Sequence, residues 1–203
     1  MGKVLKNICV FASASDNIDK KYFDVAKELG EKLAKNSYNI IYGGSNLGLM
    51  GEISSSACQF GAKITGIMPE KLYNLGISEG NCHNFIVTKG MRERKAKMDE
   101  LSDGIVVLSG GFGTLEEVSE MLVQKQLGYN NKPIVFLNTD NFYAHLIDFF
   151  NKIIKENFAP KETTTMYFVA NTPQEAIDYL KNYKNEEIDY LDKKLKIKNQ
   201  SKV

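Results

Sequence analysis

The sequence predicts an α/β protein: a single domain built on a Rossmann-like open parallel sheet with helices on both faces. Short apolar runs alternate with longer segments of helical spacing along the chain, which is typical of parallel strands joined by right-handed helical crossovers. Three of the short runs, ICVFA, GIVVL and PIVFL, consist of apolar residues throughout. Such runs indicate strands that are buried on both faces, as in an all-parallel sheet.

The elements of the N-terminal half follow from these runs and from the residues that stop them. Strands are predicted over 8–12, 39–42, 63–68 and 84–88, and helices over about 18–36, 47–60 and 91–101. Residues 13–17 form a small-polar loop after the first strand, Gly43-Gly44 stops the second strand, and Pro69 stops the third. Gly61 is placed where a helix would end.

The C-terminal half continues the same alternation. Strands are predicted over 105–108, 133–137 and 167–169, and helices over about 114–127 and up to about 157, with a last helix that begins at Pro173. In such sheets ligands bind beyond the carboxyl ends of the strands, where loops lead into helices. The glycine-rich loops of this chain fall in those places, so we look there for the site.

Length and composition fit one globular domain. The chain has 203 residues, of which 43% are hydrophobic and 25% are charged, with a net charge of +1. Charges of both signs are mixed and no broad basic stripe with interleaved aromatic residues is present, so nucleic acid is disfavoured as a partner. We predict a nucleotide-binding catalytic domain over residues 1–183 and a charged tail over residues 184–203.

The cysteines and the apolar segments predict the compartment. Cys9, Cys58 and Cys82 are far apart and odd in number, which disfavours a disulfide framework or a zinc site and favours a reducing cytoplasm. No stretch approaches the roughly 18 apolar residues of a membrane span, and the N-terminus lacks a signal-peptide pattern. We therefore expect a cytoplasmic protein with no metal, no cofactor and no membrane partner.

The strongest chemical feature is the strand GIVVL followed directly by Ser109-Gly110-Gly111-Phe112-Gly113-Thr114. Glycines at 110, 111 and 113 lack Cβ atoms, so backbone N–H groups can approach an anion closely. A helix that begins near Thr114 adds unpaired N–H groups and the positive end of its dipole, and the Thr114 hydroxyl can cap the helix or bind phosphate. The alternative is a tight strand-to-helix turn without a ligand. The spacing matches neither the P-loop nor the dinucleotide fingerprint.

Glu116 and Glu117 lie in the first turn of that helix, and only one of them can face the cleft. A carboxylate is repelled by phosphate, so a purely phosphate-binding role is excluded for it. Near a ribose, a carboxylate can stabilise positive charge at the anomeric carbon or activate water. The alternative is that these residues only complement the helix dipole, which we favour for Glu116.

A second cluster, from Gly90 to Lys95, contains three cations at the start of a predicted helix. Cations are unfavourable at a helix N-terminus, so this cluster indicates an anionic partner. Arg94 offers a fork that matches phosphate and Lys95 a point charge. Met91 shares a helix face with Arg94 because the two are three residues apart, whereas Arg92 is interpreted as a solvated surface residue.

A third cluster combines Gly43, Gly44, Gly48 and Gly51 after the second strand. It permits close approach of a base, ribose or phosphate to Gly44, but a plain turn with close helix packing explains it equally well. Ser13, at the end of the first strand, could line the same crevice. His83 and His145 are too isolated for a metal site or a catalytic triad.

Three of these segments together resemble a known family. Gly43-Gly44 with Gly48-Leu49-Met50-Gly51, then Met91-x-x-Arg94-Lys95, then Gly110-Gly111-x-Gly113-Thr114-x-x-Glu117 occur in this order. They resemble the LOG ("Lonely guy") family of cytokinin riboside 5′-monophosphate phosphoribohydrolases, many of which were labelled "possible lysine decarboxylase". The resemblance covers residues 7–180. One position departs from the family pattern, because Ser109 replaces the proline that stiffens this turn.

The resemblance implies hydrolysis of the N-glycosidic bond of a nucleoside 5′-monophosphate, such as AMP or an N6-prenylated AMP, to free base and ribose 5-phosphate. It implies that Arg94 and Glu117 are the catalytic pair. It also implies that Gly110, Gly111, Gly113 and Thr114 hold the 5′-phosphate with help from Lys95, and that the protein is a homodimer or a higher homo-oligomer.

Three alternatives remain open at this stage. The first is a non-catalytic nucleotide- or cofactor-carrying module of the same superfamily, which the Arg94 and Glu117 pair disfavours. The second is a lysine decarboxylase, which needs a Schiff-base lysine for pyridoxal phosphate, and no lysine stands out in that role. The third is a single-strand DNA-binding module of the DNA-processing type, which the near-neutral charge disfavours.

Overall fold

The computed structural model describes residues 5–78 and 83–184, and these form one seven-stranded parallel sheet. Its strand order is β4-β3-β2-β1-β5-β6-β7, and every pair of neighbours is parallel. The strands are β1 (Asn7–Phe11), β2 (Asn39–Tyr42), β3 (Ile64–Pro69), β4 (Asn84–Thr88), β5 (Gly104–Val107), β6 (Ile134–Leu137) and β7 (Phe168–Ala170). The predicted Rossmann-like sheet is therefore confirmed.

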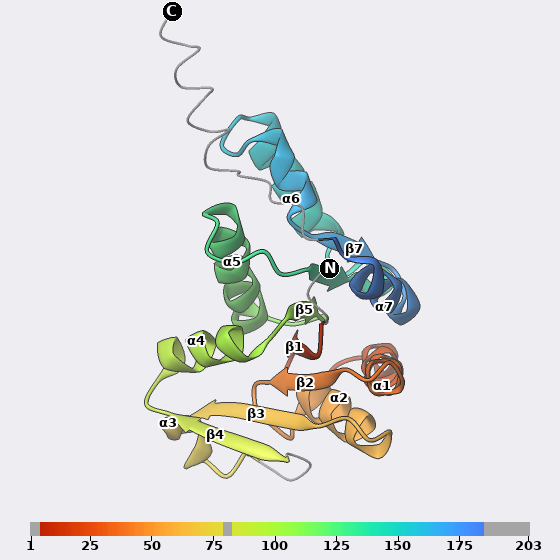
Figure 1. Cartoon of the computed structure of the whole chain (residues 1–203), viewed down its shortest axis with the longest axis vertical. Helices are drawn as coiled ribbons and strands as arrows, with labels where there is room; N and C mark the ends of the chain where they lie inside the picture. The colour runs from red at the N-terminus through yellow and green to blue at the C-terminus, as the bar shows by residue number, and fades with distance from the viewer. Residues whose placement is uncertain (1–4, 79–82, 185–203) are drawn as a thin grey trace, which may run out of the picture.

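Helices cover both faces of the sheet (Figure 1). They are α1 (Lys20–Lys35), α2 (Gly48–Gln59), α3 (Glu70–Tyr73), α4 (Met91–Leu101), α5 (Phe112–Gln126), α6 (Ala144–Lys155) and α7 (Pro173–Asn182), with two 3₁₀ segments, η1 (Thr139–Asn141) and η2 (Lys161–Thr165). Alternate residues of a strand point to opposite faces. Accordingly Ile8 and Val10 pack with α1, α2 and α7, whereas Cys9 and Phe11 pack with α4, α5 and α6.

The position of the functional crevice follows from the strand order. The chain builds β1 to β4 outward in one direction, then returns to place β5 on the other side of β1. Phe11 lies opposite Val107 in this pairing. The loops after β1 and β5 therefore lead to opposite faces of the sheet, and a crevice opens between them, as at the switch points of other open α/β sheets.

Most predicted elements agree with the structure to within one or two residues. The helix after the glycine loop starts earlier than predicted, at Phe112 with Gly111 as its N-cap. The short helix α3 was not predicted, because four residues carry no detectable periodicity. The tail predicted over residues 184–203 lies outside the described residues beyond 184.

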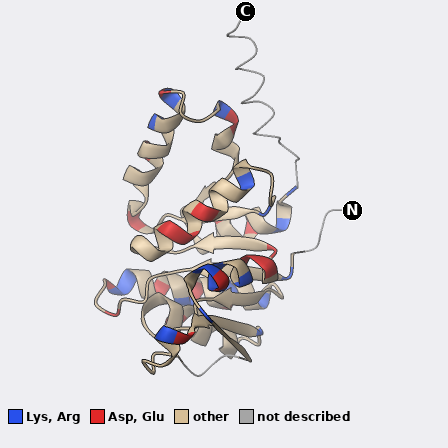
Figure 2. Cartoon of the chain, turned by 90° about the vertical axis from the view of Figure 1, so that its left-hand side faces the viewer, with Lys and Arg blue, Asp and Glu red and all other residues tan. Residues whose placement is uncertain are grey.

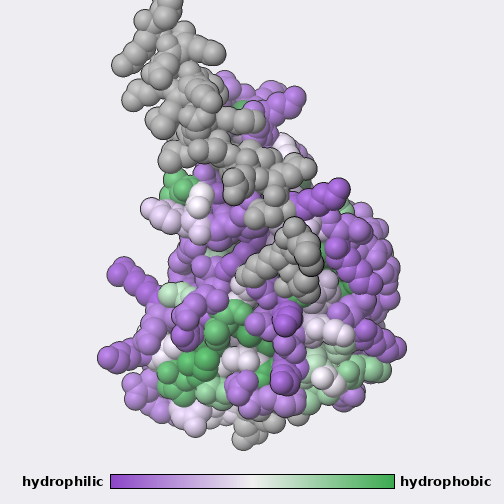
Figure 3. Space-filling model, viewed as in Figure 1, coloured by the Kyte–Doolittle hydropathy of each residue, from purple (hydrophilic) through white to green (hydrophobic). Residues whose placement is uncertain are grey.

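The β4 edge of the sheet is partly uncovered. The Val87 side chain of β4 is 46% exposed, and the space-filling view has a hydrophobic area over β3 and β4 (Figure 3). Within the described ranges, no helix combines the length and apolar character needed to cross a membrane.

Candidate functional site

A cavity of about 320 Å³ lies beyond the carboxyl ends of β1, β2, β3 and β5, within the size range of small-molecule sites, which starts near 300 Å³. Its lining combines a polar end with an apolar wall. It is lined by Ala12, Ser13, Ala14, Gly43, Ser45, Met50, Met68, Leu72, Ile77, Met91, Arg94, Gly111, Gly113, Thr114 and Glu117. The structure thus brings Ser13, Met91, Arg94, Gly111, Gly113, Thr114 and Glu117, all predicted site residues, to one cavity.

A buried ion pair joins the second cluster to the glycine loop's helix. Arg94 Nη1 donates to Glu117 Oε1 at 2.6 Å, and Arg94 Nε donates to the carbonyl of Ile67 at 3.0 Å. Arg94 is only 5% exposed and Glu117 only 4%. The guanidinium passes so close to Gly43 that a Cβ there would overlap Nη2. Gly43 is therefore needed to let Arg94 reach its partner.

Burial controls the ionisation of the Glu117 carboxyl. Loss of solvation raises its pKa above the usual range, and the Arg94 guanidinium partly offsets this by favouring the charged form. A carboxylate with a raised pKa, held in a cleft by one specific partner, is typical of groups that take or give protons in catalysis. Glu116 is different, because it is more than half exposed and pairs with Lys95 outside the cavity.

The start of α5 is the candidate anion site. Gly111 is its N-cap, with no side-chain cap bond, so the N–H groups of Phe112, Gly113 and Thr114 have no acceptor within the helix. A Cβ added to Gly111 or to Gly113 would have no heavy-atom neighbour within 4 Å. Neither residue has the positive φ that favours glycine. Neither packing within the chain nor backbone conformation therefore demands glycine here, and a ligand that approaches the backbone would.

Gly110 has a different role from its two neighbours. A Cβ at Gly110 would lie 2.6 Å from the Cβ of Thr114 and would overlap its hydroxyl. Gly110 does not line the cavity. It is glycine because the turn packs against the first turn of α5, and its direct contact with phosphate remains a prediction.

The third cluster, the glycines from Gly43 to Gly51, is explained mainly by contacts within the chain. The first N–H groups of α2 are already used, since Gly48 N–H donates to Asp16 Oδ1 at 2.8 Å and Met50 N–H to the Ser13 carbonyl at 3.2 Å. Gly44 has a φ of +79° and packs against Phe85. It does not line the cavity, whereas Gly43 does. Of the two readings of this cluster, close packing accounts for Gly44 and Gly48.

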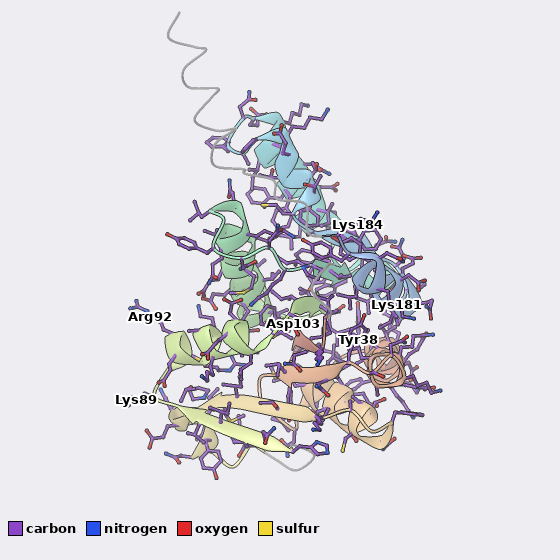
Figure 4. All side chains as sticks on the ribbon, in the orientation of Figure 1. Tyr38, Lys89, Arg92, Asp103, Lys181 and Lys184 are labelled. Atoms are coloured by element: carbon purple, nitrogen blue, oxygen red, sulfur yellow. The ribbon has the colours of Figure 1, made fainter. Side chains whose placement is uncertain are left out.

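Lys95 is directed away from the cavity. Its ammonium pairs with Glu116 and, at 2.5 Å, with Glu120, both on α5. The structure therefore does not bring Lys95 to the predicted phosphate position, and its charge serves to tie α4 to α5. Arg92 is exposed and extends outward from the start of α4 (Figure 4), as predicted for a solvated residue.

The apolar wall of the cavity escaped the sequence analysis. Met50, Met68, Leu72 and Ile77 come from four separate segments, and each reads as an ordinary core residue in its local pattern. Only Met50 had a local signal, because it lies within the third glycine cluster. These side chains make part of the cavity lining apolar, and Ser13, Ser45 and Thr114 add hydroxyl groups to the same cavity.

The described residues show neither a metal cluster nor a Schiff-base amine in the cleft. Among them, no group of three or more His, Cys, Asp or Glu side chains could hold a metal ion. His83 Nδ1 accepts a hydrogen bond from the Ile64 N–H at 3.1 Å, which is a structural role. None of the described residues that line the cavity is a lysine. Charges of both signs are interspersed on the side where α4 and α5 lie (Figure 2).

Comparison with known proteins gives the family. A family model described as "Possible lysine decarboxylase" matches residues 50–180, more than half of the chain. The cytokinin riboside 5′-monophosphate phosphoribohydrolase LOG5 of Arabidopsis thaliana is 34% identical over 179 residues, which cover 88% of this chain and 78% of that protein. The chain belongs to the LOG family. A probable cytokinin riboside 5′-monophosphate phosphoribohydrolase of Oryza sativa subsp. japonica, LOGL6, is 35% identical over 88% of this chain and 71% of its own length.

Solved structures support the fold of this LOG-family chain. The Moco carrier protein from Chlamydomonas reinhardtii superposes with a TM-score of 0.68 at 24% identity, over 88% of this chain and 96% of that one. At this identity the similarity extends to the fold alone. The LOG motifs quoted from the sequence meet at the cavity, with Arg94 from the second motif on Glu117 from the third.

Proposed function

We propose that this LOG-family chain hydrolyses the N-glycosidic bond of a nucleoside 5′-monophosphate, either AMP or an N6-substituted AMP such as a cytokinin nucleotide. The products are the free base and ribose 5-phosphate. One observation carries the proposal: the buried Arg94–Glu117 pair lies in the same cavity as Gly111 and Gly113, whose missing side chains leave unfilled space at a helix N-terminus. Relatives at 34% to 35% identity are named as phosphoribohydrolases of this kind.

In the proposed mechanism the 5′-phosphate anchors the nucleotide in the cavity. The free N–H groups at the start of α5, the backbone of Gly111 and Gly113, and the Thr114 hydroxyl bind its oxygens. Binding energy realised at this distance from the reacting bond positions the ribose over the carboxylate. The apolar wall receives the base.

Glu117 acts at the anomeric carbon. As the bond from C1′ to the base nitrogen breaks, C1′ gains positive charge, and a preorganised carboxylate stabilises it or activates the incoming water. The water oxygen bonds to C1′ and gives up a proton, while the electron pair of the broken bond stays on the base nitrogen, which takes up a proton, so that one water molecule is consumed. Arg94 favours the ionised form of the buried carboxylate and fixes its orientation.

The test is a product assay by chromatography across a panel of nucleoside monophosphates. We expect Glu117→Gln to abolish base release while AMP binding persists, and Arg94→Ala to weaken both. Glu116→Gln is the matched control, since it changes the neighbouring, exposed carboxylate, and we expect it to keep activity. If Glu117→Gln retained most of the activity, the role given to Glu117 would be wrong.

The same assay separates the alternatives. Protein that binds AMP but releases no adenine over hours would indicate a carrier rather than an enzyme. A change in the absorbance spectrum on incubation with pyridoxal phosphate would revive the decarboxylase reading, whereas we expect a flat spectrum.

We further propose that the chain is a cytoplasmic homodimer. Cys9 and Cys58 are free thiols, which suits a reducing compartment. An apolar groove between α5 and α6 offers an interface, lined among others by Val123, Phe150 and Ile153, and α6 has no buried residue in the single chain despite its apolar face. Light scattering should give twice the chain mass, and Val123→Lys should reduce it.

A further inference from the structure

Tyr143, which belongs to none of the sequence motifs, contacts the backbone of the glycine loop. The Tyr143 hydroxyl donates to the Leu108 carbonyl at 2.6 Å, and the Gly110 N–H, on the other side of Ser109, interacts with the same phenol oxygen and favours its charged form. The buried Tyr143 phenol therefore contacts the backbone on both sides of Ser109. Tyr143 is 5% exposed and does not line the cavity, so it acts on the loop and not on a ligand.

The turn before α6 is built to place this side chain. Asp140 and Asn141 adopt positive φ values of 51° and 58°, a conformation that costs free energy in residues other than glycine. Asn138 Oδ1 accepts a hydrogen bond from the Tyr143 N–H at 2.8 Å. The Tyr143 ring packs edge-on against Phe136 of β6 at 5.2 Å between centroids. Backbone and ring are thus both fixed under the loop.

Ser109 is the position that needs this support. Its hydroxyl is buried, and among the described residues it has no hydrogen-bond partner. Nor does its N–H make a backbone hydrogen bond to any of them. A proline, which the LOG pattern has here, would fix φ and stiffen the turn. Serine leaves the turn free to move, so its shape depends on what holds its neighbours.

We infer that Tyr143 is a positioning residue that holds the glycine loop in its anion-binding shape, in place of the proline that this chain lacks. This clamp, formed by Tyr143 on Leu108 and Gly110, restricts the motion of Gly110. Gly110 precedes the N-cap Gly111, so the clamp also restricts the free N–H groups at the start of α5. Its effect on ligand affinity rests on the proposed function, because the ligand is taken to bind through its phosphate.

The experiment compares Tyr143→Phe with Tyr167→Phe in the full chain. Tyr167 is the matched control because its ring also packs edge-on against Phe136, at 5.5 Å, without contacting the loop. We expect Tyr143→Phe to raise the dissociation constant of AMP about tenfold, the size of one lost hydrogen bond, and Tyr167→Phe to leave it unchanged. In the free protein, amide hydrogen exchange at Gly110 should accelerate in Tyr143→Phe alone.

Ser109→Pro distinguishes positioning from general packing. In that background the turn is stiff without the clamp, so adding Tyr143→Phe should raise the dissociation constant less than about threefold. An equal loss in both backgrounds would overturn the inference, as would unchanged Gly110 exchange in Tyr143→Phe. If Ser109→Pro does not fold, the exchange measurement and the Tyr167→Phe comparison still decide it. Failure of the wild type to bind AMP would refute the proposed function and leave the exchange result to judge the clamp.

Discussion

Gly113→Ala should make the protein more stable and its nucleotide binding weaker. Gly113 lies in the first turn of α5, without positive φ, and a Cβ there meets no atom of the chain within 4 Å. Replacing glycine by alanine in a helix contributes about 0.5–1 kcal/mol of stability when nothing clashes. The unfolding free energy of Gly113→Ala should therefore rise by about that amount.

The same methyl group occupies the space that we assign to phosphate. Displacing one charge-assisted hydrogen bond costs about 1.5–3 kcal/mol, so the dissociation constant of AMP should rise about 10- to 150-fold. Urea denaturation measures the first effect and titration calorimetry the second. Improved stability with weakened binding is the signature of a glycine kept for a ligand.

Gly110→Ala is the contrasting variant. Its Cβ would lie 2.6 Å from the Cβ of Thr114, so we expect it to lose about 1–3 kcal/mol of stability through overpacking. If Gly113→Ala bound AMP as tightly as the wild type, the anion site would not be where we place it. If it lost stability instead, the space beside Gly113 would not be open.

Three further predictions concern the charged residues. Arg94→Ala should lower the unfolding free energy by about 3–5 kcal/mol at neutral pH, because the buried Glu117 carboxylate loses its partner; in denaturation experiments this loss should shrink as the pH falls and Glu117 protonates, and a pH-independent loss would contradict it. Lys95→Met should change the dissociation constant of AMP less than about twofold, since its ammonium pairs with Glu116 and Glu120 and does not line the cavity; a tenfold change would return Lys95 to the phosphate site. Burial lowers the pKa of Lys125 to about 8. As the pH rises, the Lys125 ammonium therefore loses its proton in the folded state before it does so in the unfolded state. The contribution of Lys125 to the unfolding free energy of the wild type should accordingly increase between about pH 8 and pH 10.5. The stability of Lys125→Met relative to the wild type should therefore fall by about 2 kcal/mol between pH 7 and pH 10, and a constant difference in paired denaturation curves would refute the lowered pKa.

The sequence by itself determined the fold and the position of the glycine loop. Apolar runs such as ICVFA and GIVVL indicate strands that are buried on both faces. Their alternation with helices is compatible with only a few topologies. The glycines at 110, 111 and 113 after a strand indicated an anion site, because turn chemistry is also local. Residue chemistry already favoured a helix-dipole role for Glu116, and the catalytic role of Glu117 followed from the family resemblance.

Only the tertiary structure decided which of these residues work together. Arg94 and Glu117 are 23 positions apart, and their contact depends on how α4 and α5 pack on the sheet, where both contact β1. The same packing takes Lys95 away to Glu120. A periodic pattern records that a side chain is buried, but not against what.

The clamp under the loop shows this limit most directly. Tyr143 is separated from Leu108 by 35 positions, and in the sequence it reads as one more aromatic residue near a helix start. Its hydroxyl reaches the glycine loop because β5 and β6 are neighbours in the sheet, with Val107 opposite Phe136. Strand order places these two segments side by side, and the crossovers that set strand order leave no trace in the local sequence around Tyr143.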